Sequence, residues 1–263
     1  MVGAGGGAGA VLHARGPTSR PFAWASVTKL LTALAVHVAC EEGTLHLEGS
    51  LDLDHVGGPP GATVSHLLAH ASGLGFAAGD PTRAPATRRT YSNVGYEVLA
   101  DALADAAGMP FDTYLAEAVL GPLRMTATRL EGSAAAGAVG PVDDLARLAS
   151  ELLDPTLLSR EGAARVSAVA FPGLDGVLPG FGLRRPKDWG LGPEVRGTED
   201  PHWTPPGSSP ATFGHFGQAG GFLWVDPEAR VACAVLGAQP FGPWARAAWP
   251  ALGSAVLEAS RSR

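Results

Sequence analysis

The fold of this chain is indicated most clearly by the segment Ser26-Val-Thr-Lys-Leu-Leu-Thr-Ala-Leu-Ala-Val-His-Val-Ala-Cys-Glu-Glu42. Its apolar residues recur at the spacing of a helix that buries one face. These residues are Val27, Leu30, Leu31, Leu34 and Val38. Gly43 follows at once, and glycine commonly ends helices. The sequence therefore predicts a helix over Ser26–Glu42, with Ser26 at its N-terminus.

A lysine lies one helical turn into this segment. The chain has 19 lysines and arginines, but only Lys29 and Lys187 are lysines. A lysine can lose its proton and act as a base, which a guanidinium cannot do. Residues three apart share a helix face, and a helix N-terminus stabilises an oxyanion. Ser26 and Lys29 therefore form a candidate nucleophile and base, although Ser26 as a helix N-cap remains the alternative.

Two further motifs follow, Tyr91-Ser-Asn93 and His215-Phe-Gly217. With Ser26-Val-Thr-Lys29 before them, their order resembles the serine β-lactamase and penicillin-binding-protein superfamily, in its class C-type branch of esterases and D-amino-acid peptidases. The likeness covers nearly the whole chain. Its longer stretches are Phe22-Ala-Trp-Ala-Ser-Val-Thr-Lys29, His66-Leu-Leu-Ala-His-Ala-Ser-Gly-Leu74, Tyr91-Ser-Asn-Val-Gly-Tyr96 and Gly214-His-Phe-Gly-Gln-Ala-Gly-Gly-Phe-Leu-Trp-Val-Asp-Pro227.

The resemblance implies a role for each matching residue. Ser26 would attack a substrate carbonyl and form an acyl-enzyme. Lys29 and Tyr91 would share the proton transfers, since a phenol beside an ammonium ionises more easily. Asn93 would hydrogen-bond the substrate amide and orient Lys29. The backbone N–H groups of Ser26 and Gln218 would form the oxyanion hole.

His215 and Gly217 complete the substrate-binding residues that the resemblance implies. Plainer roles remain open for several members of the set. Tyr91 alone is also compatible with a core or rim tyrosine, and Asn93 with a cap before a predicted helix over Val94–Ala107. His215 is also compatible with a structural histidine.

The third motif departs from that of a true β-lactamase. Where those enzymes place a lysine and then a small hydroxyl residue, this chain has His215 and Phe216, which removes one permanent charge and one donor. Arg184, Arg185 and Arg196 precede the motif and are candidates to bind a substrate carboxylate instead. An esterase or amide hydrolase for uncharged substrates is therefore expected at least as strongly as an antibiotic hydrolase.

The motifs together predict a serine hydrolase that acts through a covalent acyl-enzyme on an ester, amide or β-lactam carbonyl, esterase-like or β-lactamase-related. One alternative is an acyltransferase with the same Ser/Lys/Tyr site, which passes the acyl group to an acceptor other than water. Another is a non-turnover penicillin-binding or sensor protein. The substrate would be a small molecule or a peptide, and no cofactor is expected.

Composition points away from polyanionic partners. The net charge is −6, the pI is about 5.7, and basic residues form no run, so neither nucleic acid nor an anionic membrane is expected as a partner. The apolar stretch Leu30–Cys40 is too short to span a bilayer. Met1–Ala10 has no secretion-signal pattern and predicts a flexible start. We expect a cytoplasmic monomer by default, or an extracellular protein if the natural N-terminus is longer.

Histidine and cysteine patterns favour structural roles. His66 and His70 have the spacing of two metal ligands on a helix, but Leu67 stands where a metalloprotease has its glutamate. No metal site is therefore expected. Cys40 and Cys233 fall in apolar surroundings and are predicted to be buried free thiols.

The predicted fold class is α/β (α+β), β-lactamase/transpeptidase-like. An antiparallel sheet flanked by helices would lie beside a mostly helical subdomain, with the active site in the cleft between them. The chain is expected to form a single catalytic domain over residues 1–263. Residues 1–47 and 165–263 would make the α/β half, and residues 48–164 the helical half.

Local patterns place the remaining elements. Short strands are predicted over Val11–Ala14, Gly220–Val225 and Arg230–Gly237, and a closing helix over Trp244–Ser260. Because only Val11–Ala14 precedes the first motif, the N-terminal strand pair typical of the superfamily is expected to be truncated. Asp143 and Asp144 are expected to cap a helix over Leu145–Leu153.

Overall fold

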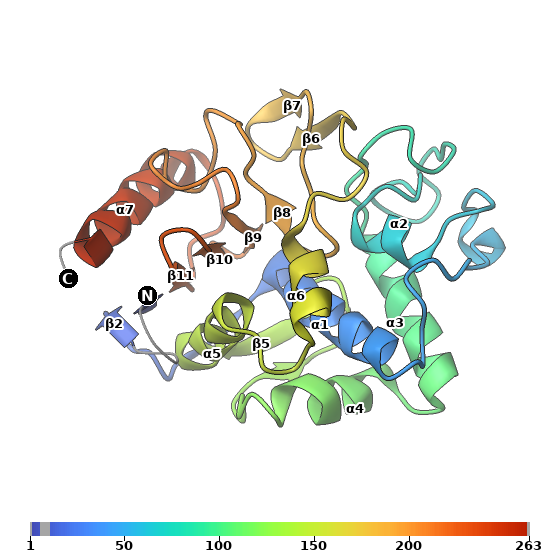
Figure 1. The fold of residues 1–263 in the computed structure, drawn as a ribbon, viewed down its shortest axis with the longest axis horizontal. Helices are drawn as coiled ribbons and strands as arrows, with labels where there is room; N and C mark the ends of the chain where they lie inside the picture. The colour runs from blue at the N-terminus through green and yellow to red at the C-terminus, as the bar shows by residue number, and fades with distance from the viewer. Residues whose placement is uncertain (1, 6–10, 262–263) are drawn as a thin grey trace.

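The computed structural model describes residues 2–5 and 11–261 (Figure 1). An antiparallel six-stranded sheet has helices on both faces, and a mostly helical region lies beside it. In spatial order the strands are β2 (Val11–Ala14), β1 (Val2–Gly5), β11 (Val231–Val235), β10 (Gly221–Asp226), β9 (Phe213–Gly217) and β8 (Glu194–Val195). The α+β class predicted from the sequence is confirmed.

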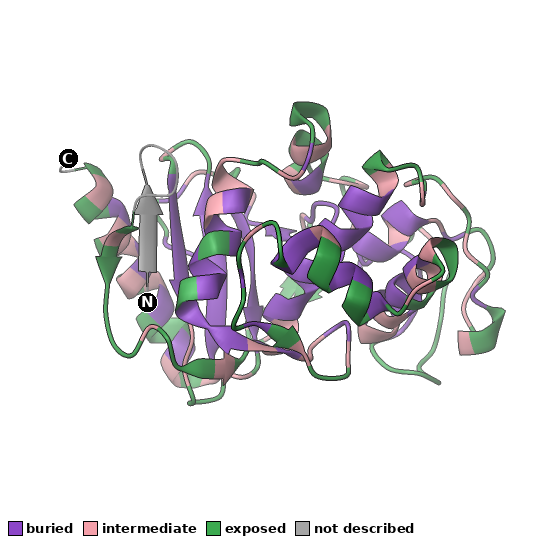
Figure 2. Cartoon of the chain, turned by 90° about the horizontal axis from the view of Figure 1, so that it is seen from below, coloured by how far each residue is buried: buried purple, intermediate pink, exposed green. Residues whose placement is uncertain are grey.

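The central strands bury both of their faces, because alternate residues point to opposite sides of a sheet. Phe222 and Trp224 pack on the side of α7 (Pro243–Arg261), where the Phe222 ring lies 5.0 Å from that of Trp249. Leu223, between them, joins the main core on the other side. Both faces of these central strands are therefore buried, and their buried residues are purple in Figure 2.

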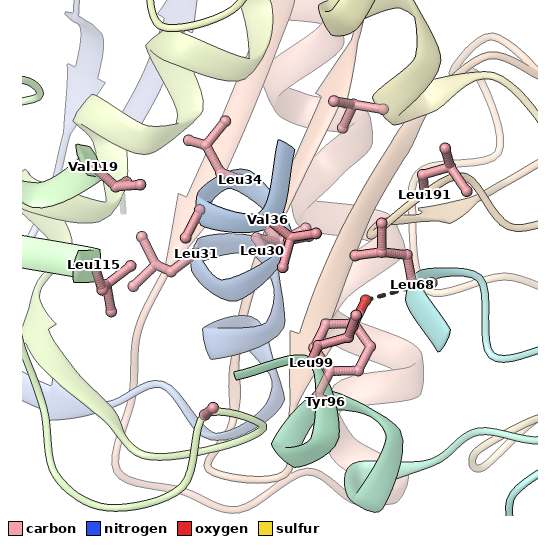
Figure 3. Close-up of a cluster of buried hydrophobic side chains, with 14 of the residues drawn as sticks. Leu30, Leu31, Leu34, Val36, Leu68, Tyr96, Leu99, Leu115, Val119 and Leu191 are labelled. Atoms are coloured by element: carbon pink, nitrogen blue, oxygen red, sulfur yellow. Dashed lines mark hydrogen bonds between the residues drawn. The ribbon is translucent and has the colours of Figure 1, made fainter. Parts of the chain in front are cut away.

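The helix α1 (Thr28–Glu41) forms the centre of the main core, and all of its residues from 28 to 39 are buried. Figure 3 shows its leucines between Leu115 and Val119 on one side and Leu68 and Tyr96 on the other. The Tyr96 hydroxyl donates to the Leu68 carbonyl at 3.0 Å. A helix enclosed on every side holds the start of its first turn in a fixed place.

The remaining elements surround α1. The helices are α2 (Val64–Leu68), α3 (Asn93–Ala107), α4 (Phe111–Leu115) with the π-helical turn η3 (Ala116–Leu120), α5 (Val142–Leu153) and α6 (Arg160–Ser167), with 3-10 turns η1 (Ala25–Val27) and η2 (Asp54–Val56). Two small sheets are β3 (Pro21–Ala23), β5 (Ala138–Pro141) and β4 (Arg129–Leu130), and the pair β6 (Gly176–Leu178) and β7 (Gly182–Arg184). Among the described residues, no helix combines the length and apolar character needed to cross a membrane.

Most ends of the predicted helices and strands lie within one or two residues of those in the structure. The helix expected from Ser26 begins instead as the 3-10 turn η1, and the α-helical part starts at Thr28. The helix expected over Val94–Ala107 begins one residue earlier, at Asn93. The assignment of residues 1–47 and 165–263 to one half and 48–164 to the other stays a prediction.

The N-terminal prediction was wrong in part. Residues Val2–Gly5 form the strand β1, which pairs with both β2 and β11, so the strand pair is present rather than truncated. The expected flexible start therefore fails for these four residues, and residues 1 and 6–10 lie outside the described part of the chain. A glycine- and alanine-rich segment gives little strand signal by itself, because pairing with β11 supplies the order.

Two local predictions also change. Asp143 and Asp144 lie in the first turn of α5, but the buried Asp144 carboxylate accepts from the Ala127 N–H and the Thr128 hydroxyl, so it anchors a neighbouring loop. Both cysteines are free, as expected, but only Cys233 is fully buried. Cys40 is half-buried, because it lies near the end of α1 where the helix leaves the core.

Gly73 provides a test of the packing of the loop beside the active site. Its φ of +86° already disfavours a side chain, and a Cβ there would lie 1.9 Å from the Arg83 carbonyl oxygen. We expect Gly73→Ala to lower the free energy of unfolding by about 3 kcal/mol, from backbone strain and overpacking together. Denaturant unfolding measures this change.

Gly79→Ala is the matched control. Gly79 has a similar φ of +84°, but a Cβ there would meet nothing within 4 Å. In this variant the free energy of unfolding should fall by only about 1 kcal/mol, from backbone strain alone. Equal losses in the two variants would contradict the close approach of Gly73 and Arg83.

Candidate active site

Ser26 lies in a turn whose backbone is held under strain. Ala25, directly before it, has a φ of +46°, a left-handed conformation that is uncommon for a residue with a side chain. The buried Trp24 fixes this turn, because its backbone N–H donates to the Ala138 carbonyl at 2.9 Å and its indole N–H to the Gly140 carbonyl at 3.1 Å. Strained backbone that its surroundings maintain is typical of functional sites.

The strand β9 ends against the same turn. A Cβ on Gly217 would lie 2.3 Å from the Trp24 carbonyl oxygen and 3.3 Å from the Ser26 nitrogen, so only glycine permits this approach. Gln218, the next residue, lines the same cavity as Ser26. The structure thus brings together the two residues whose N–H groups were predicted to form an oxyanion hole.

Lys29 is completely buried one turn into the helical segment. Its ammonium donates to the Asn93 side-chain oxygen at 2.6 Å and to the Ala135 carbonyl at 2.9 Å. The nitrogen also lies 4.7 Å from the centre of the Tyr91 ring. Removal from water lowers the pKa of Lys29 to about 7, against the opposing charge of Glu97. A large fraction of Lys29 is therefore neutral near pH 7 and able to accept a proton.

Tyr91 lies between Ser26 and His215. Its side chain interacts with that of Ser26, and its hydroxyl lies 3.5 Å from His215 Nε2. The expectation that this phenol ionises more easily than usual is wrong in direction. Burial raises the pKa of Tyr91 above its ordinary value, more than the interaction with Ser26 lowers it. Tyr91 is therefore a neutral donor at neutral pH.

His215 is buried on β9, and its Nδ1 lies 2.7 Å from the Phe216 carbonyl oxygen. A carbonyl can only accept, so Nδ1 carries the hydrogen and Nε2 presents a lone pair to Tyr91. Burial and then the charge of Lys29 lower the pKa of His215 to about 4. The imidazole is neutral at pH 7 and does not replace the permanent charge that a lysine would bring.

His66 and His70 make separate contacts in the scaffold. His66 Nδ1 accepts from the Thr63 N–H at 3.2 Å and so forms part of the N-terminal capping box of α2. His70 is fully buried, its Nδ1 accepts from the Ser92 N–H at 3.1 Å, and its ring lies 4.4 Å from that of Tyr91. His70 therefore supports both the start of α3 and the face of Tyr91.

A cavity of about 600 Å³ opens in front of Ser26. Most of its wall is apolar or aromatic, and three arginines and one glutamate also contribute. The lining residues are Ala25, Ser26, Phe76, Arg83, Arg88, Arg89, Thr90, Tyr91, Asn93, Ala136, Val177, Pro179, Trp189, Glu194, His215, Phe216 and Gln218. The motif residues that line this cavity therefore face an apolar space large enough for a substrate.

The arginines suggested by the sequence for carboxylate binding have other partners. Arg184 donates to Glu199 at 3.1 Å and Arg185 to Asp175 at 3.1 Å. Arg196 is buried and donates to the Thr204 hydroxyl at 3.0 Å. None of the three lines the cavity.

The other lysine is held behind the cavity. Lys187 is fully buried and donates to Glu194 at 2.6 Å and to Glu199 at 2.8 Å, and His202 Nε2 lies 2.8 Å from Glu194. The ligand atoms of these two glutamates and His202 lie within 4.8 Å of one another, which is close enough for a metal ion. The Lys187 ammonium supplies the positive charge there. Sequence reasoning missed this cluster, because its members follow no motif.

Comparison with known proteins agrees with this geometry. The family model named Beta-lactamase matches residues 8–257. The crystal structure of a β-lactamase from Mycobacterium bovis is 49% identical, with a TM-score of 0.93 over 98% of this chain and 94% of that one. The octameric penicillin-binding protein homologue from Pyrococcus abyssi shares the fold, with a TM-score of 0.76 and 20% identity over 97% and 72% of the two chains.

The D-alanyl-D-alanine-carboxypeptidase/endopeptidase AmpH of Escherichia coli K12 is 32% identical over a stretch that covers 40% of this chain. That stretch spans about a third of the relative, 35% of its length. Together these matches define a serine-hydrolase fold of the β-lactamase and penicillin-binding-protein type. The chain belongs to the beta-lactamase family.

The approach of β9 to the Ser26 turn can be tested at Gly217. Gly217→Ala should push β9 and the turn apart, because a Cβ would overlap the Trp24 carbonyl oxygen. We expect the rate of reaction with an activated ester to fall about 100-fold, the cost of displacing reacting groups by about 1 Å. Stopped-flow kinetics measure this rate. Gly207→Ala, where a Cβ meets nothing within 4 Å, should keep the original rate.

Proposed function

We propose that this protein is a serine hydrolase that forms a covalent acyl-enzyme on Ser26 and turns over carboxylic esters with an apolar acyl group. The observation that carries the proposal is the buried Lys29, whose pKa of about 7 provides a neutral amine one turn from Ser26. Tyr91, whose side chain interacts with Ser26 on the same cavity, and the apolar wall of that cavity support it.

The reaction follows from the protonation states of the three side chains. As Ser26 Oγ attacks the carbonyl carbon, its proton passes to neutral Lys29, directly or through Tyr91. The N–H groups of Ser26 and Gln218 stabilise the oxyanion. The C–O bond to the alcohol then breaks, and the leaving oxygen takes a proton through the Tyr91 hydroxyl. Water next attacks the acyl carbonyl carbon and gives a proton to neutral Lys29. The bond between that carbon and Ser26 Oγ then breaks, and Ser26 takes this proton from Lys29 as the acid leaves.

A β-lactam is the second candidate substrate. The relative from Mycobacterium bovis, 49% identical over nearly the whole chain, is described as a β-lactamase. The neutral His215 gives the β9 side of the site no permanent cation for a lactam carboxylate, which favours the ester. Acyl transfer to an alcohol or amine would use the same site, and faster product formation on adding such an acceptor identifies it.

Ser26→Ala tests the covalent step. Wild type and variant are mixed with a penicillin, a cephalosporin, a short p-nitrophenyl ester and a D-alanyl peptide, and intact-protein mass and product release are followed. We expect a transient adduct and turnover with the ester in the wild type, and neither in Ser26→Ala. Turnover that survives in the variant would refute the mechanism. A permanent lactam adduct would instead identify a penicillin-binding or sensor protein.

The pH profile tests Lys29 as the base. A base with a depressed pKa is active above that pKa, so kcat/KM for a neutral ester should rise tenfold per pH unit below about 7 and level off above it. His215, with a pKa of about 4, is already neutral over this range. Because burial raises the pKa of Tyr91 above its ordinary 10, no descending limb should appear below pH 10.

Two variants test whether the rise of kcat/KM below pH 7 comes from Lys29 or from another titrating group. Lys29→Met removes the proton acceptor with little change of size, and Lys29→Arg keeps a charge that cannot be lost. Both should lower kcat/KM by at least about 100-fold, the usual contribution of a general base. If the residual kcat/KM of either variant still rises with pH up to about 7, this pH dependence belongs to another group.

A further inference from the structure

Two arginines on the wall of the cavity have side chains without a partner among the described residues. Arg83 and Arg88 both line the space in front of Ser26. Within residues 2–5 and 11–261, neither guanidinium has a hydrogen bond or an ion pair. Arg83 is exposed and Arg88 is half-buried, so both can reach a bound molecule.

The neighbouring Arg89 has a structural role instead. Its buried guanidinium donates to the carbonyl oxygens of Ala69, Ala170, Phe171 and Lys187, and the Lys187 contact measures 2.7 Å. Four carbonyl acceptors from three separate segments hold Arg89 and its backbone in place. Arg88 therefore projects from a fixed position.

Backbone hydrogen bonds fix the rest of this loop. The Arg83 N–H donates to the Gly73 carbonyl at 3.0 Å and the Ala86 N–H to the Ala71 carbonyl at 2.8 Å. The Thr90 N–H donates to the His70 carbonyl at 2.9 Å, directly beside Tyr91. The loop is thus attached to the same scaffold that holds the active-site tyrosine, and only the side chains of its arginines need to be ordered when they bind.

A second hollow of about 450 Å³ shares these two arginines with the cavity. Its charged members are Arg83, Arg88, Arg185 and Asp175. Arg185 and Asp175 pair with each other at 3.1 Å, so the two remaining charges are both positive. The hollow is therefore an electropositive extension of an apolar cavity.

Apolar side chains connect the cavity with this hollow. Phe76 and Val177 line the cavity and are 53% and 50% exposed. Leu183, which lines the second hollow, is 44% exposed. A molecule lying along them would cover apolar surface and end beside two guanidinium groups.

We infer that Arg83 and Arg88 form an anion-binding subsite, which selects substrates whose apolar body ends in a carboxylate. This inference rests on the proposed hydrolysis at Ser26 and names the substrate class of that same site. A carboxylate matches the planar donors of guanidinium groups, and such charge-assisted bonds are the stronger ones. The neutral body of the substrate fills the cavity, and its charged end lies in the second hollow.

The kinetic test compares esters of equal size. Mono-p-nitrophenyl esters of dicarboxylic acids carry the charge on the acyl side, and p-nitrophenyl alkanoates of matched length are neutral. We expect the wild type to prefer the anionic ester about tenfold in kcat/KM, as one good charge-assisted hydrogen bond provides. In Arg83→Gln/Arg88→Gln this ratio should fall to about one, mainly through KM. A second series, with the carboxylate on the leaving group, shows which side of the scissile bond reaches the subsite.

Arg160→Gln is the matched control. Arg160 is exposed on α6 and lines neither hollow, so removing one arginine charge there should leave the ratio unchanged. A wild-type ratio near one in both ester series would overturn the subsite and leave the proposed hydrolase intact. A tenfold preference for the anionic ester that persists in Arg83→Gln/Arg88→Gln would also overturn the subsite and leave the proposed hydrolase intact.

A binding measurement makes the test independent of turnover. Calorimetry on Ser26→Ala compares 6-phenylhexanoate with its primary amide, which has the same shape and no charge. The carboxylate should bind about tenfold more tightly, and the difference should disappear when Arg83→Gln and Arg88→Gln are added. Equal binding of the two molecules refutes the subsite. If the carboxylate is preferred but no ester is turned over, the proposed hydrolase fails and the subsite stands.

Discussion

The burial of one ammonium group determines how the rest of the site is built. Lys29 lies inside the core on the first turn of α1, with Asn93 and the Ala135 carbonyl as its hydrogen-bond acceptors. A charge in this position is costly, and the protein lowers the cost by lowering the pKa of Lys29 to about 7. The segments around it must then keep water out and keep the two acceptors in place. The same burial that creates the base therefore also requires a rigid surrounding scaffold.

The elements around Ser26 satisfy this requirement from three sides. The helix α1 is enclosed by the core, β9 lies against the turn at Gly217, and the Trp24 indole fixes that turn to the Gly140 carbonyl. The left-handed Ala25 is maintained by these contacts rather than by local preference. His70 holds the start of α3, which carries Asn93. Residues far apart in the chain thus act on one short turn.

Sequence patterns captured the parts of this arrangement that depend on local spacing. The helix after Ser26, the hairpin of β10 and β11 and the closing helix follow from apolar periodicity. The features that these patterns missed depend on residues far away in the sequence. The strand Val2–Gly5 is specified by pairing with β11, and the pKa of Tyr91 by burial that no motif encodes. The roles of Arg184 and Lys187 likewise depend on carboxylates that only the folded chain brings near.

The position of positive charge in the cavity is consistent with the needs of Lys29. A second permanent cation on β9 beside Lys29 would lower the pKa of Lys29 further, and the charge of Lys29 already lowers that of His215. A neutral imidazole avoids this repulsion and leaves β9 without a permanent cation for a substrate carboxylate. Arg83 and Arg88 instead lie on a more exposed wall, where water and substrate share the cost of their charge. Separating the base from the anion-binding groups allows each to keep the protonation state that its task requires.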